Sequence, residues 1–215
     1  MSEELYHPPE WISSKAHIAS MEQYREMYER SINNPEEFWI EQANHFSWYK
    51  KWDEVRSFNY DVTQGNIKIE WFKGGKCNIT SNCLDRHLET KGEQIAIIWE
   101  GNEPGENISL TYNELHREVC KFANVLKNHG VKKGDRVSIY MPMVIELAIA
   151  MLACARLGAV HSIVFGGFSP TALADRIVDS SCKILITTDG GYRGEKPIAI
   201  KANADQAISL AEKQG

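Results

Sequence analysis

The spacing of apolar residues changes twice along the chain, and each change predicts a different kind of structure. Between Met21 and Tyr28 apolar side chains recur at helical intervals, and Ser20 stands in capping-box spacing before a glutamine, which predicts a helix start. A second helix is predicted to begin at Pro35, with Asn34 placed to cap it. The apolar face of this second helix consists of Phe38, Trp39, Ala43 and Phe46.

The pattern over residues 48–77 is different, because apolar residues alternate in short pieces and aromatic side chains are frequent. Ile67, Ile69 and Trp71 alternate with polar residues as in a strand, and the glycine pair at 74–75 has turn composition. We interpret this segment as extended and as packing on a larger body, since aromatic side chains mainly bury area. An aromatic platform for a ligand is the alternative.

From Asn82 onward the pattern predicts an α/β fold. The first predicted elements are a short helix over 83–90, a strand over 94–100, an extended piece over 108–110 and a long helix. Asn82 and Asp85 are placed to cap the short helix. Thr111 and Glu114 form a capping box at the start of the long helix, and Gly130 is suited to end it. The residues along one face of the long helix are Leu115, Val119, Phe122 and Leu126.

Strands and helices then alternate to the end of the chain. The predicted strands cover 136–141, 161–165 and 183–187, and the predicted helices cover 144–157, 170–179 and 203–213. Alternation at this length implies a parallel sheet with right-handed crossovers, and ligands usually bind at the carboxyl ends of such strands. Because no strand follows the last helix, we expect one edge and one face of the sheet to lack cover.

Composition narrows the class of protein. The 215 residues are 43% hydrophobic and 25% charged, with a net charge of -5, which is ordinary for a soluble globular protein. No basic block or arginine-rich helix is present, so we expect no nucleic-acid partner. The first residues lack a signal-peptide pattern and the longest apolar run is too short to span a bilayer, so no membrane partner is expected. Five cysteines without a CxxC pair indicate neither a zinc site nor a disulfide framework, and they fit the cytoplasm.

Two glycine-rich loops follow predicted strands and hold the candidate ligand contacts. Gly166 and Gly167 precede a helix that Ser169 is placed to cap, so backbone and helix end could meet an anion. The alternative, which the spacing alone favours, is a strand-to-helix turn that needs a positive φ. The second loop bears Arg193 and Lys196, which suit a phosphate or a nucleobase. A solvated turn is the alternative there, since most exposed Arg and Lys are merely solvated.

No common catalytic motif accompanies these loops. The sequence contains no GxGxxG, GxxxxGK[ST], GxSxG or HExxH pattern. His87 and His161 are interpreted as hydrogen-bonded structural residues rather than general bases. No nucleophile, base and orienting group are brought together by spacing, and we therefore assign no catalytic residue.

Four blocks of the sequence resemble the N-terminal portion of the AMP-forming acetyl-coenzyme A synthetases, a family of the adenylate-forming superfamily. The blocks are YREMYERSINNPEEFW, WFKGGKCNITSNCLDRHL, YMPMVIELAIAMLACARLGAVHSIVFGGFSPTALADRI and TTDGGYRGEKPIAIK. They occur in the family's order with similar gaps, from about Tyr24 to the end of the chain. The match is therefore far more specific than either glycine pair.

The resemblance implies a fold and a reaction. Residues 1–81 would form a helical, aromatic-rich segment packed on the first βαβ units of the large AMP-binding domain, which would begin at residue 82 and be truncated at residue 215. Acetate would attack the α-phosphate of Mg-ATP to give acetyl-adenylate and pyrophosphate. The thiolate of CoA would then displace AMP. Acetate, ATP and CoA are thus the implied small-molecule partners, with magnesium as cofactor.

The resemblance also assigns contacts to the nucleotide end of CoA. Arg193 would meet its 3′-phosphate or adenine, and Lys196 would add charge. Some family members have arginine in place of Lys196, and lysine keeps the charge but lacks the bidentate fork. The residues assigned in this way are Arg193, Gly194, Glu195 and Lys196, with Phe165, Gly166 and Gly167 beside them.

Several motifs of the family have no counterpart in these residues. They are the ATP phosphate loop, the adenine and acetate pockets, the magnesium ligands and the C-terminal domain with its adenylation lysine. We therefore expect an N-terminal piece of an acetate–CoA ligase that is inactive alone, with the ATP and magnesium sites outside it. A propionyl-CoA synthetase fragment and a naturally short CoA-binding, nucleotide-binding or regulatory module are the alternatives. Self-association through surface exposed by truncation is a further expectation.

Overall fold

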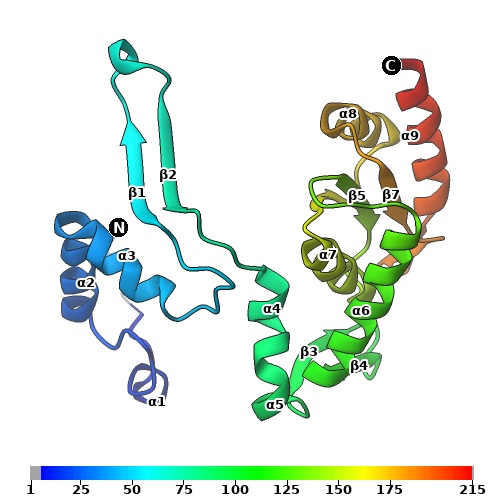
Figure 1. The fold of residues 1–215 in the computed structure, drawn as a ribbon. Coiled ribbons are helices and arrows are strands. Elements are labelled where there is room, and N and C mark those ends of the chain that lie inside the picture. Colours follow the sequence, from blue (N-terminus) through cyan, green and yellow to red (C-terminus); the bar gives the residue numbers. More distant parts are fainter. Residues whose placement is uncertain (1–5, 215) are drawn as a thin grey trace, which may run out of the picture. The chain divides into compact units, whose positions relative to one another are not determined.

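The computed structural model of the protein describes residues 6–214, except the side chain of Arg193. The chain forms two compact units, one up to Lys76 and one from Cys77 onward, and the named strands of each pair within their own unit (Figure 1). The architecture is mixed α/β, as the sequence predicted. The domain boundary expected between residues 81 and 82 stays a prediction.

The first unit begins with helices. They are α1 (Glu10–Ser13), α2 (Met21–Asn33) and α3 (Pro35–Ala43). The predicted start of α2 is confirmed, because the Ser20 hydroxyl accepts a hydrogen bond from the Gln23 backbone at 3.1 Å. Asn34 does stand at the N-cap of α3, but its side chain makes no capping hydrogen bond. On the predicted apolar face of α3, Phe38 is buried while Trp39 is 42% exposed.

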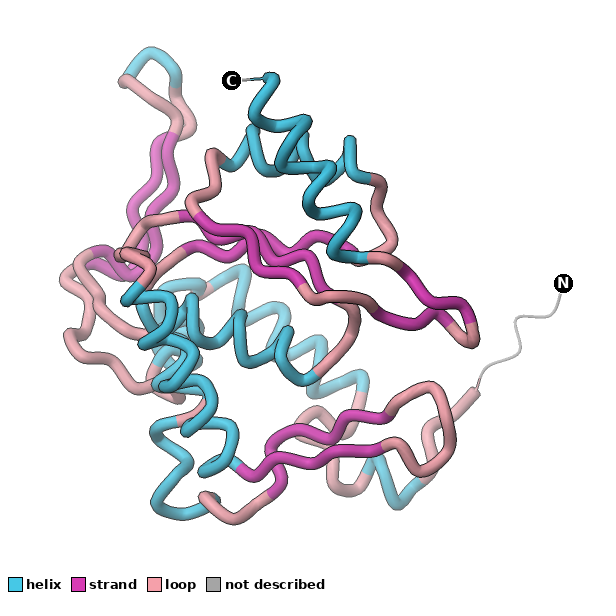
Figure 2. Tube along the Cα trace, turned by 90° about the vertical axis from the view of Figure 1, so that its right-hand side faces the viewer, coloured by secondary structure: helices cyan, strands magenta, loops and turns pink. Residues whose placement is uncertain are grey.

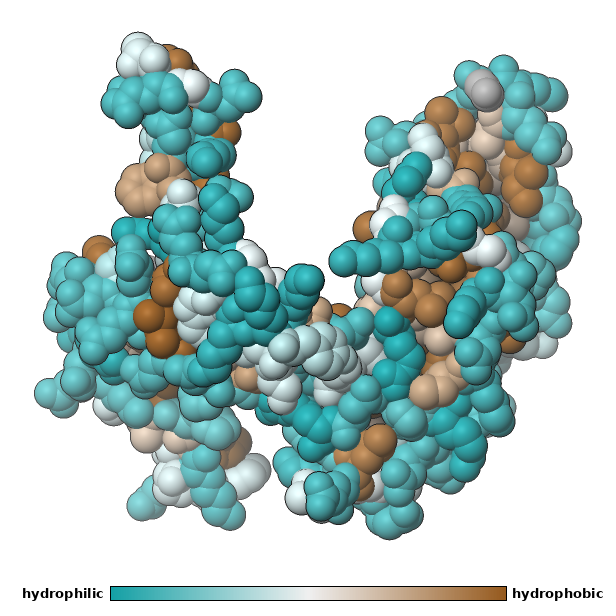
Figure 3. All heavy atoms as spheres, viewed as in Figure 1, coloured by the Kyte–Doolittle hydropathy of each residue, from teal (hydrophilic) through white to brown (hydrophobic). Residues whose placement is uncertain are grey.

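A hairpin completes the first unit and confirms the extended interpretation of its aromatic stretch. Strands β1 (Glu54–Asn59) and β2 (Lys68–Lys73) pair antiparallel and are joined through the short 3-10 helix η1 (Val62–Gln64). Trp52 packs its ring 4.9 Å from Phe72 and 5.1 Å from Trp48, centroid to centroid. Gly74 turns the chain after β2 with a φ of +79°, a value that favours glycine. Figure 3 shows hydrophobic surface between hydrophilic side chains on this unit.

The second unit contains the predicted parallel sheet. Its strands are β5 (Arg136–Met141), β6 (Val160–Phe165) and β7 (Ile184–Thr187), in the order β6-β5-β7. Helices α6 (Tyr112–Asn128) and α7 (Ile145–Leu157) pack together, as do α8 (Pro170–Ser180) and α9 (Ile200–Gln214). Figure 2 shows helices on both sides of these strands.

Alternate side chains of β5 belong to two different cores. Val137, Ile139 and Met141 lie in a cluster with residues of α6 and α7. Tyr140 lies in a second cluster with Leu173 of α8 and residues of α9. Because successive side chains of a strand point to opposite faces, β5 is buried on both sides of the sheet.

A hairpin and a capped helix precede the sheet. Strands β3 (Ile95–Glu100) and β4 (Asn107–Thr111) pair antiparallel. The predicted capping box at α6 is confirmed, with Thr111 Oγ1 3.2 Å from the Glu114 nitrogen and Glu114 Oε2 2.9 Å from the Thr111 nitrogen. The backbone N–H of Thr111 holds the pKa of Glu114 below its ordinary value, so its carboxylate stays ionised.

The predicted helix over 83–90 is wrong. The chain forms α4 (Ile79–Cys83), the 3-10 helix η2 (Asp85–His87) and α5 (Leu88–Lys91) in its place. The helix is interrupted at Leu84, whose backbone lies outside the helical region with a φ of -121° and a ψ of -66°, and whose side chain is buried in the core formed with α6 and α7. The capping residue is Asn78, whose Oδ1 accepts from the Thr80 nitrogen at 2.8 Å, whereas Asn82 donates to the Asn78 carbonyl.

Two short strands were missed in the second glycine-rich loop. Strands β8 (Gly191–Arg193) and β9 (Lys196–Ile198) pair antiparallel, and Gly194 turns between them with a φ of +60°. Pieces of three residues are too short for a periodic pattern, which explains the omission. Helix α9 also begins three residues earlier than the predicted 203.

Strand β6 lies at one edge of the three-stranded sheet. It pairs with β5 on one side, and its residues Ile163 and Phe165 are 46% and 59% exposed. Self-association through this surface stays a prediction. Within residues 6–214, no helix is both long and apolar enough to cross a membrane.

We expect the substitution Ile139→Ala in β5 to lower the free energy of unfolding by about 2–5 kcal/mol, because the side chain is fully buried and leaves a cavity. The matched control is Ile98→Ala in β3, whose side chain is 70% exposed and whose loss should cost less than about 0.5 kcal/mol. Urea unfolding followed by circular dichroism compares the two. Equal losses would contradict a central position for β5.

Candidate ligand-binding cleft

A cleft of about 1370 Å³ lies in the second unit at the carboxyl ends of all three parallel strands. Met141 of β5, Phe165 of β6 and Thr187 of β7 line it where their strands end. The end of β3 contributes Trp99, whose indole N–H donates to the Met143 carbonyl at 2.7 Å. This is the position at which open α/β sheets bind ligands. The volume exceeds the 300–1,000 Å³ or so typical of small-molecule sites.

Phe165, Gly166 and Gly167 lie together on the cleft wall, between β6 and α8. A methyl group on Gly166 would stand 3.1 Å from the Met141 carbonyl oxygen, and one on Gly167 would stand 2.6 Å from the Phe165 ring. Neither glycine has a positive φ, so the alternative of a strand-to-helix turn that needs a positive φ is wrong. A side chain at position 166 would press on the end of β5, and one at position 167 would press on the Phe165 ring, so the lack of a side chain suits both positions.

The loop is closed by its own backbone and by the start of α8. The Phe168 N–H donates to the Phe165 carbonyl at 2.9 Å. The Ser169 hydroxyl accepts from the Ala172 N–H at 3.3 Å, which confirms the predicted cap. The Arg176 guanidinium lies 4.6 Å from the centre of the Phe168 ring.

The buried Tyr140 joins this loop to the centre of the sheet. Its hydroxyl donates to the Phe168 carbonyl at 2.8 Å and accepts from Asn203 Nδ2 of α9 at 3.4 Å. Sequence reasoning missed both polar residues. Tyr140 could have been noticed, because its hydroxyl stands in the apolar end of the predicted strand 136–141 and a buried tyrosine hydroxyl usually has a hydrogen-bond partner.

The β8–β9 hairpin forms another side of the cleft through Gly191, Tyr192, Pro197 and Ile198. The hairpin turn is tied to the loop after β3, because Asn102 Nδ2 donates to the Gly194 carbonyl at 3.1 Å. Glu195 and Lys196 are exposed on this turn. The backbone of Arg193 belongs to β8, while its side chain lies outside the described part of the structure. Asn102, which lines the cleft, was not among the candidate residues.

Charge is distributed unevenly around the cleft. In the described part of the chain, every charged residue that lines the cleft is acidic. These residues are Glu100, Glu106, Glu146 and Asp189. The N–H of Gly190 and the hydroxyl of Thr188 hold the pKa of Asp189 below its ordinary value. An anionic group deep in the cleft would meet like charge, whereas one at the hairpin turn would meet Lys196.

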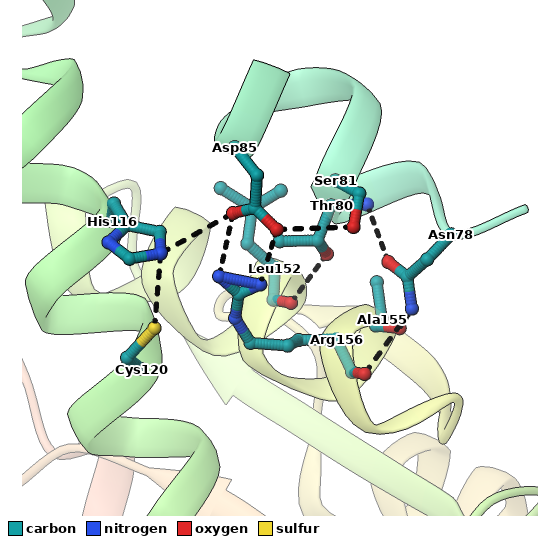
Figure 4. Close-up of polar contacts among 9 residues, drawn as sticks. All are labelled: Asn78, Thr80, Ser81, Asp85, His116, Cys120, Leu152, Ala155 and Arg156. Atoms are coloured by element: carbon teal, nitrogen blue, oxygen red, sulfur yellow. Dashed lines mark hydrogen bonds and ion pairs between the residues drawn. The ribbon is translucent and has the colours of Figure 1, made fainter. Parts of the chain in front are cut away.

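A separate polar cluster fixes the beginning of the second unit on α6 and α7 (Figure 4). Arg156 of α7 donates to both carboxylate oxygens of Asp85, at 2.7 and 3.0 Å. Asp85 also accepts from the Ser81 hydroxyl, and its Oδ1 lies 3.4 Å from His116 Nε2. The cluster contributes no residue to the cleft lining, and its geometry serves packing.

The cysteines and histidines do not assemble a reactive centre in the described residues. Cys154 is fully buried, and burial raises the pKa of its thiol to about 11, so the thiol stays protonated. Cys120 is half-buried beside His116 of the polar cluster. His87 packs its ring against Tyr112, which suits the structural role expected for it. No group of three or more His, Cys, Asp or Glu placed to hold a metal occurs within residues 6–214.

Comparison with known proteins identifies the two parts of the chain separately. Residues 84–214 match the family model described as AMP-binding enzyme, and residues 24–83 match the model described as acetyl-coenzyme A synthetase N-terminus. These matches confirm the resemblance that the four sequence blocks indicated.

Curated relatives carry the name acetyl-coenzyme A synthetase. The protein of Saccharophagus degradans is 59% identical over 206 residues, which are 95% of this chain and 31% of that protein. The protein of Alkalilimnicola ehrlichii is 54% identical over 205 residues, which are 95% of this chain and 31% of that protein. The protein of Magnetococcus marinus is 56% identical over 193 residues, which are 89% of this chain and 29% of that protein. The chain therefore spans about a third of the length of these relatives.

We expect the pKa of Asp189 to lie below that of an aspartate in an unstructured peptide, and Thr188→Val to raise it by removing one hydrogen bond. Because the folded-state pKa is the lower one, the carboxylate stabilises the turn fully above the unfolded pKa. This contribution is lost as the pH falls through the folded pKa. Carbon-detected NMR titration measures the shift. Asp61, whose pKa is lowered by Thr63, is the internal control and should not respond.

Proposed function

Because the chain belongs to the AMP-binding enzyme family, we propose that the protein containing it is a cytoplasmic acetate–CoA ligase of the AMP-forming type. In the first step an acetate oxygen attacks the α-phosphorus of Mg-ATP, and the bond to pyrophosphate breaks to give acetyl-adenylate. In the second step the CoA thiolate attacks the acetyl carbon, and AMP leaves with the bonding electrons. The products are acetyl-CoA, AMP and pyrophosphate.

The observation that carries the proposal is the cleft itself. Its walls bring a glycine loop at the N-terminus of α8 opposite a hairpin that bears Lys196, although the two are about thirty residues apart in sequence. The loop at Gly166 and Gly167 lines the cleft, and the exposed Phe165 ring offers apolar surface against which a nucleobase would pack.

The charges favour one orientation of CoA. Its phosphates would lie at the hairpin turn, where Lys196 is exposed, and Arg193 would contribute a second positive charge. The uncharged pantetheine arm would run along the cleft, where Glu100 and Asp189 would repel phosphate but tolerate amide groups. Gly194 and Glu195 form the turn between β8 and β9.

We assign no adenylation step to these residues. The reason is that the motifs which the family uses for that step have no counterpart among these residues. In this proposal acetate, ATP and magnesium bind to parts of the full-length protein outside the 215 residues. Whether acetate or propionate is preferred is decided there too, and comparing kcat/KM for the two acids would identify the substrate.

We expect the 215-residue chain alone to catalyse no acetate-dependent exchange between ATP and pyrophosphate, because the adenylation site lies outside it. The full-length protein should catalyse this exchange without CoA and should form acetyl-CoA when CoA is added. Radiolabelled pyrophosphate measures the exchange. Exchange by the isolated chain would contradict the proposal that the adenylation site lies outside the 215 residues. Absence of exchange from the full-length protein would contradict the ligase assignment.

We expect Arg193→Ala in the full-length protein to raise KM for CoA on the order of tenfold, since a charge-assisted hydrogen bond contributes about 1.5 kcal/mol or more. Lys196→Ala should act in the same direction. Neither change should alter ATP–pyrophosphate exchange by more than about twofold. The matched controls are Arg117→Ala and Lys121→Ala, two exposed cations of α6 that pair with a glutamate outside the cleft.

An unchanged KM for CoA in both hairpin variants would remove the hairpin from the CoA site. An equal rise in the α6 controls would show that overall charge, and not the position of the cations, causes the effect.

A further inference from the structure

We propose that Tyr140 is a positioning residue that holds the loop Phe165–Phe168 in the shape that receives the nucleotide end of CoA. The inference rests on the proposed function for the identity of the ligand. Tyr140 itself does not touch the cleft, since it is fully buried and absent from the cleft lining in the described structure. It would act through the hydrogen bond that its hydroxyl donates to the Phe168 carbonyl at 2.8 Å.

The loop follows β6, which pairs with β5 in the described residues. Phe165, the last residue of β6, is 59% exposed, and the turn after it is closed by the 2.9 Å hydrogen bond from the Phe168 N–H. The bond from Tyr140 adds a connection from the far end of this turn to the central strand.

The opposite end of that connection is rigid. The Tyr140 ring is packed in the core with Leu173 of α8 and Ile200 of α9. Its hydroxyl also accepts a hydrogen bond from Asn203 Nδ2 at 3.4 Å. The loop, β5 and α9 are therefore joined at one oxygen atom, and a packed ring with a fixed hydroxyl restricts the Phe168 carbonyl to one position.

The position of the loop matters for binding because its backbone clearances are small. A methyl group on Gly166 would stand only 3.1 Å from the Met141 carbonyl, so the loop already lies against the end of β5. A ligand that approaches the glycines must fit between this backbone and the hairpin across the cleft. A shift of about 1 Å is enough to lose oriented contacts in a binding site of this kind.

The substitution Tyr140→Phe tests this role, because it keeps the buried ring and removes only the hydroxyl. Thr80→Val is the matched control. Thr80 is also fully buried, and its hydroxyl donates to the Leu152 carbonyl at 2.9 Å, so the control removes the same kind of bond away from the cleft. Both variants are made in the full-length protein.

We expect Tyr140→Phe to raise KM for CoA roughly three- to tenfold, as for the loss of one hydrogen bond. ATP–pyrophosphate exchange should stay within about twofold of the wild type, since that step does not use the loop. Thr80→Val should leave both quantities unchanged. An unchanged KM for CoA in Tyr140→Phe would overturn the proposal, and so would an equal rise in Thr80→Val.

Hydrogen exchange separates this proposal from the proposed function. The amides of residues 166–169 should exchange several-fold faster in Tyr140→Phe than in the wild type or in Thr80→Val, whatever the activity of the protein. Unchanged exchange would overturn the positioning role. A wild-type protein without ligase activity would instead overturn the proposed function, and the exchange result would still decide whether Tyr140 positions the loop.

Asn203→Ala provides a second variant that does not disturb the tyrosine ring. It removes the bond that orients the hydroxyl from α9, so KM for CoA and loop exchange should rise by a smaller factor than in Tyr140→Phe. If Tyr140→Phe fails to fold, wild-type values of both quantities in a folded Asn203→Ala variant would overturn the proposal.

Discussion

The burial of β5 on both faces is the constraint on which the second unit depends. Val137 and Ile139 fill the core against α6 and α7, while Tyr140 fills the core against α8 and α9. A parallel strand buried in this way requires a helix after each neighbouring strand, and those crossovers bring three carboxyl ends to one edge. The cleft forms at that edge, so the same burial that stabilises the fold also determines where a ligand can bind.

Polar bonds to backbone carbonyls then connect irregular segments to this core. Tyr140 reaches the loop after β6, Asn102 reaches the turn of the β8–β9 hairpin, and Asn78 reaches the end of α7. Each donor satisfies a carbonyl at a place where the chain leaves a regular element, where backbone groups lack partners from a helix or sheet. Tyr140 and Asn102 hold two loops that line the cleft, whereas Asn78 serves the packing of α7.

In the proposed CoA site, the acidic lining of the cleft and Lys196 on the hairpin would suit a ligand whose charge is concentrated at one end. CoA has that character, with phosphates on its nucleotide and a neutral arm that ends in a thiol. Glu100 and Glu146 lie on the cleft side, and Lys196 lies on the turn. Such an arrangement favours one orientation of the ligand over its reverse, since phosphate beside the carboxylates would be repelled.

The sequence alone determined the family and the order of the main strands and helices of the α/β part. The periodicity around Leu115, the capping box at Thr111 and the apolar strands predicted the α/β fold, because these signals are local. Only the tertiary structure showed that the helix is interrupted at Leu84, that Gly194 turns a hairpin, and that Tyr140 reaches Phe168. These features depend on contacts between residues distant in sequence or on pieces too short to be periodic, and no local pattern encodes either.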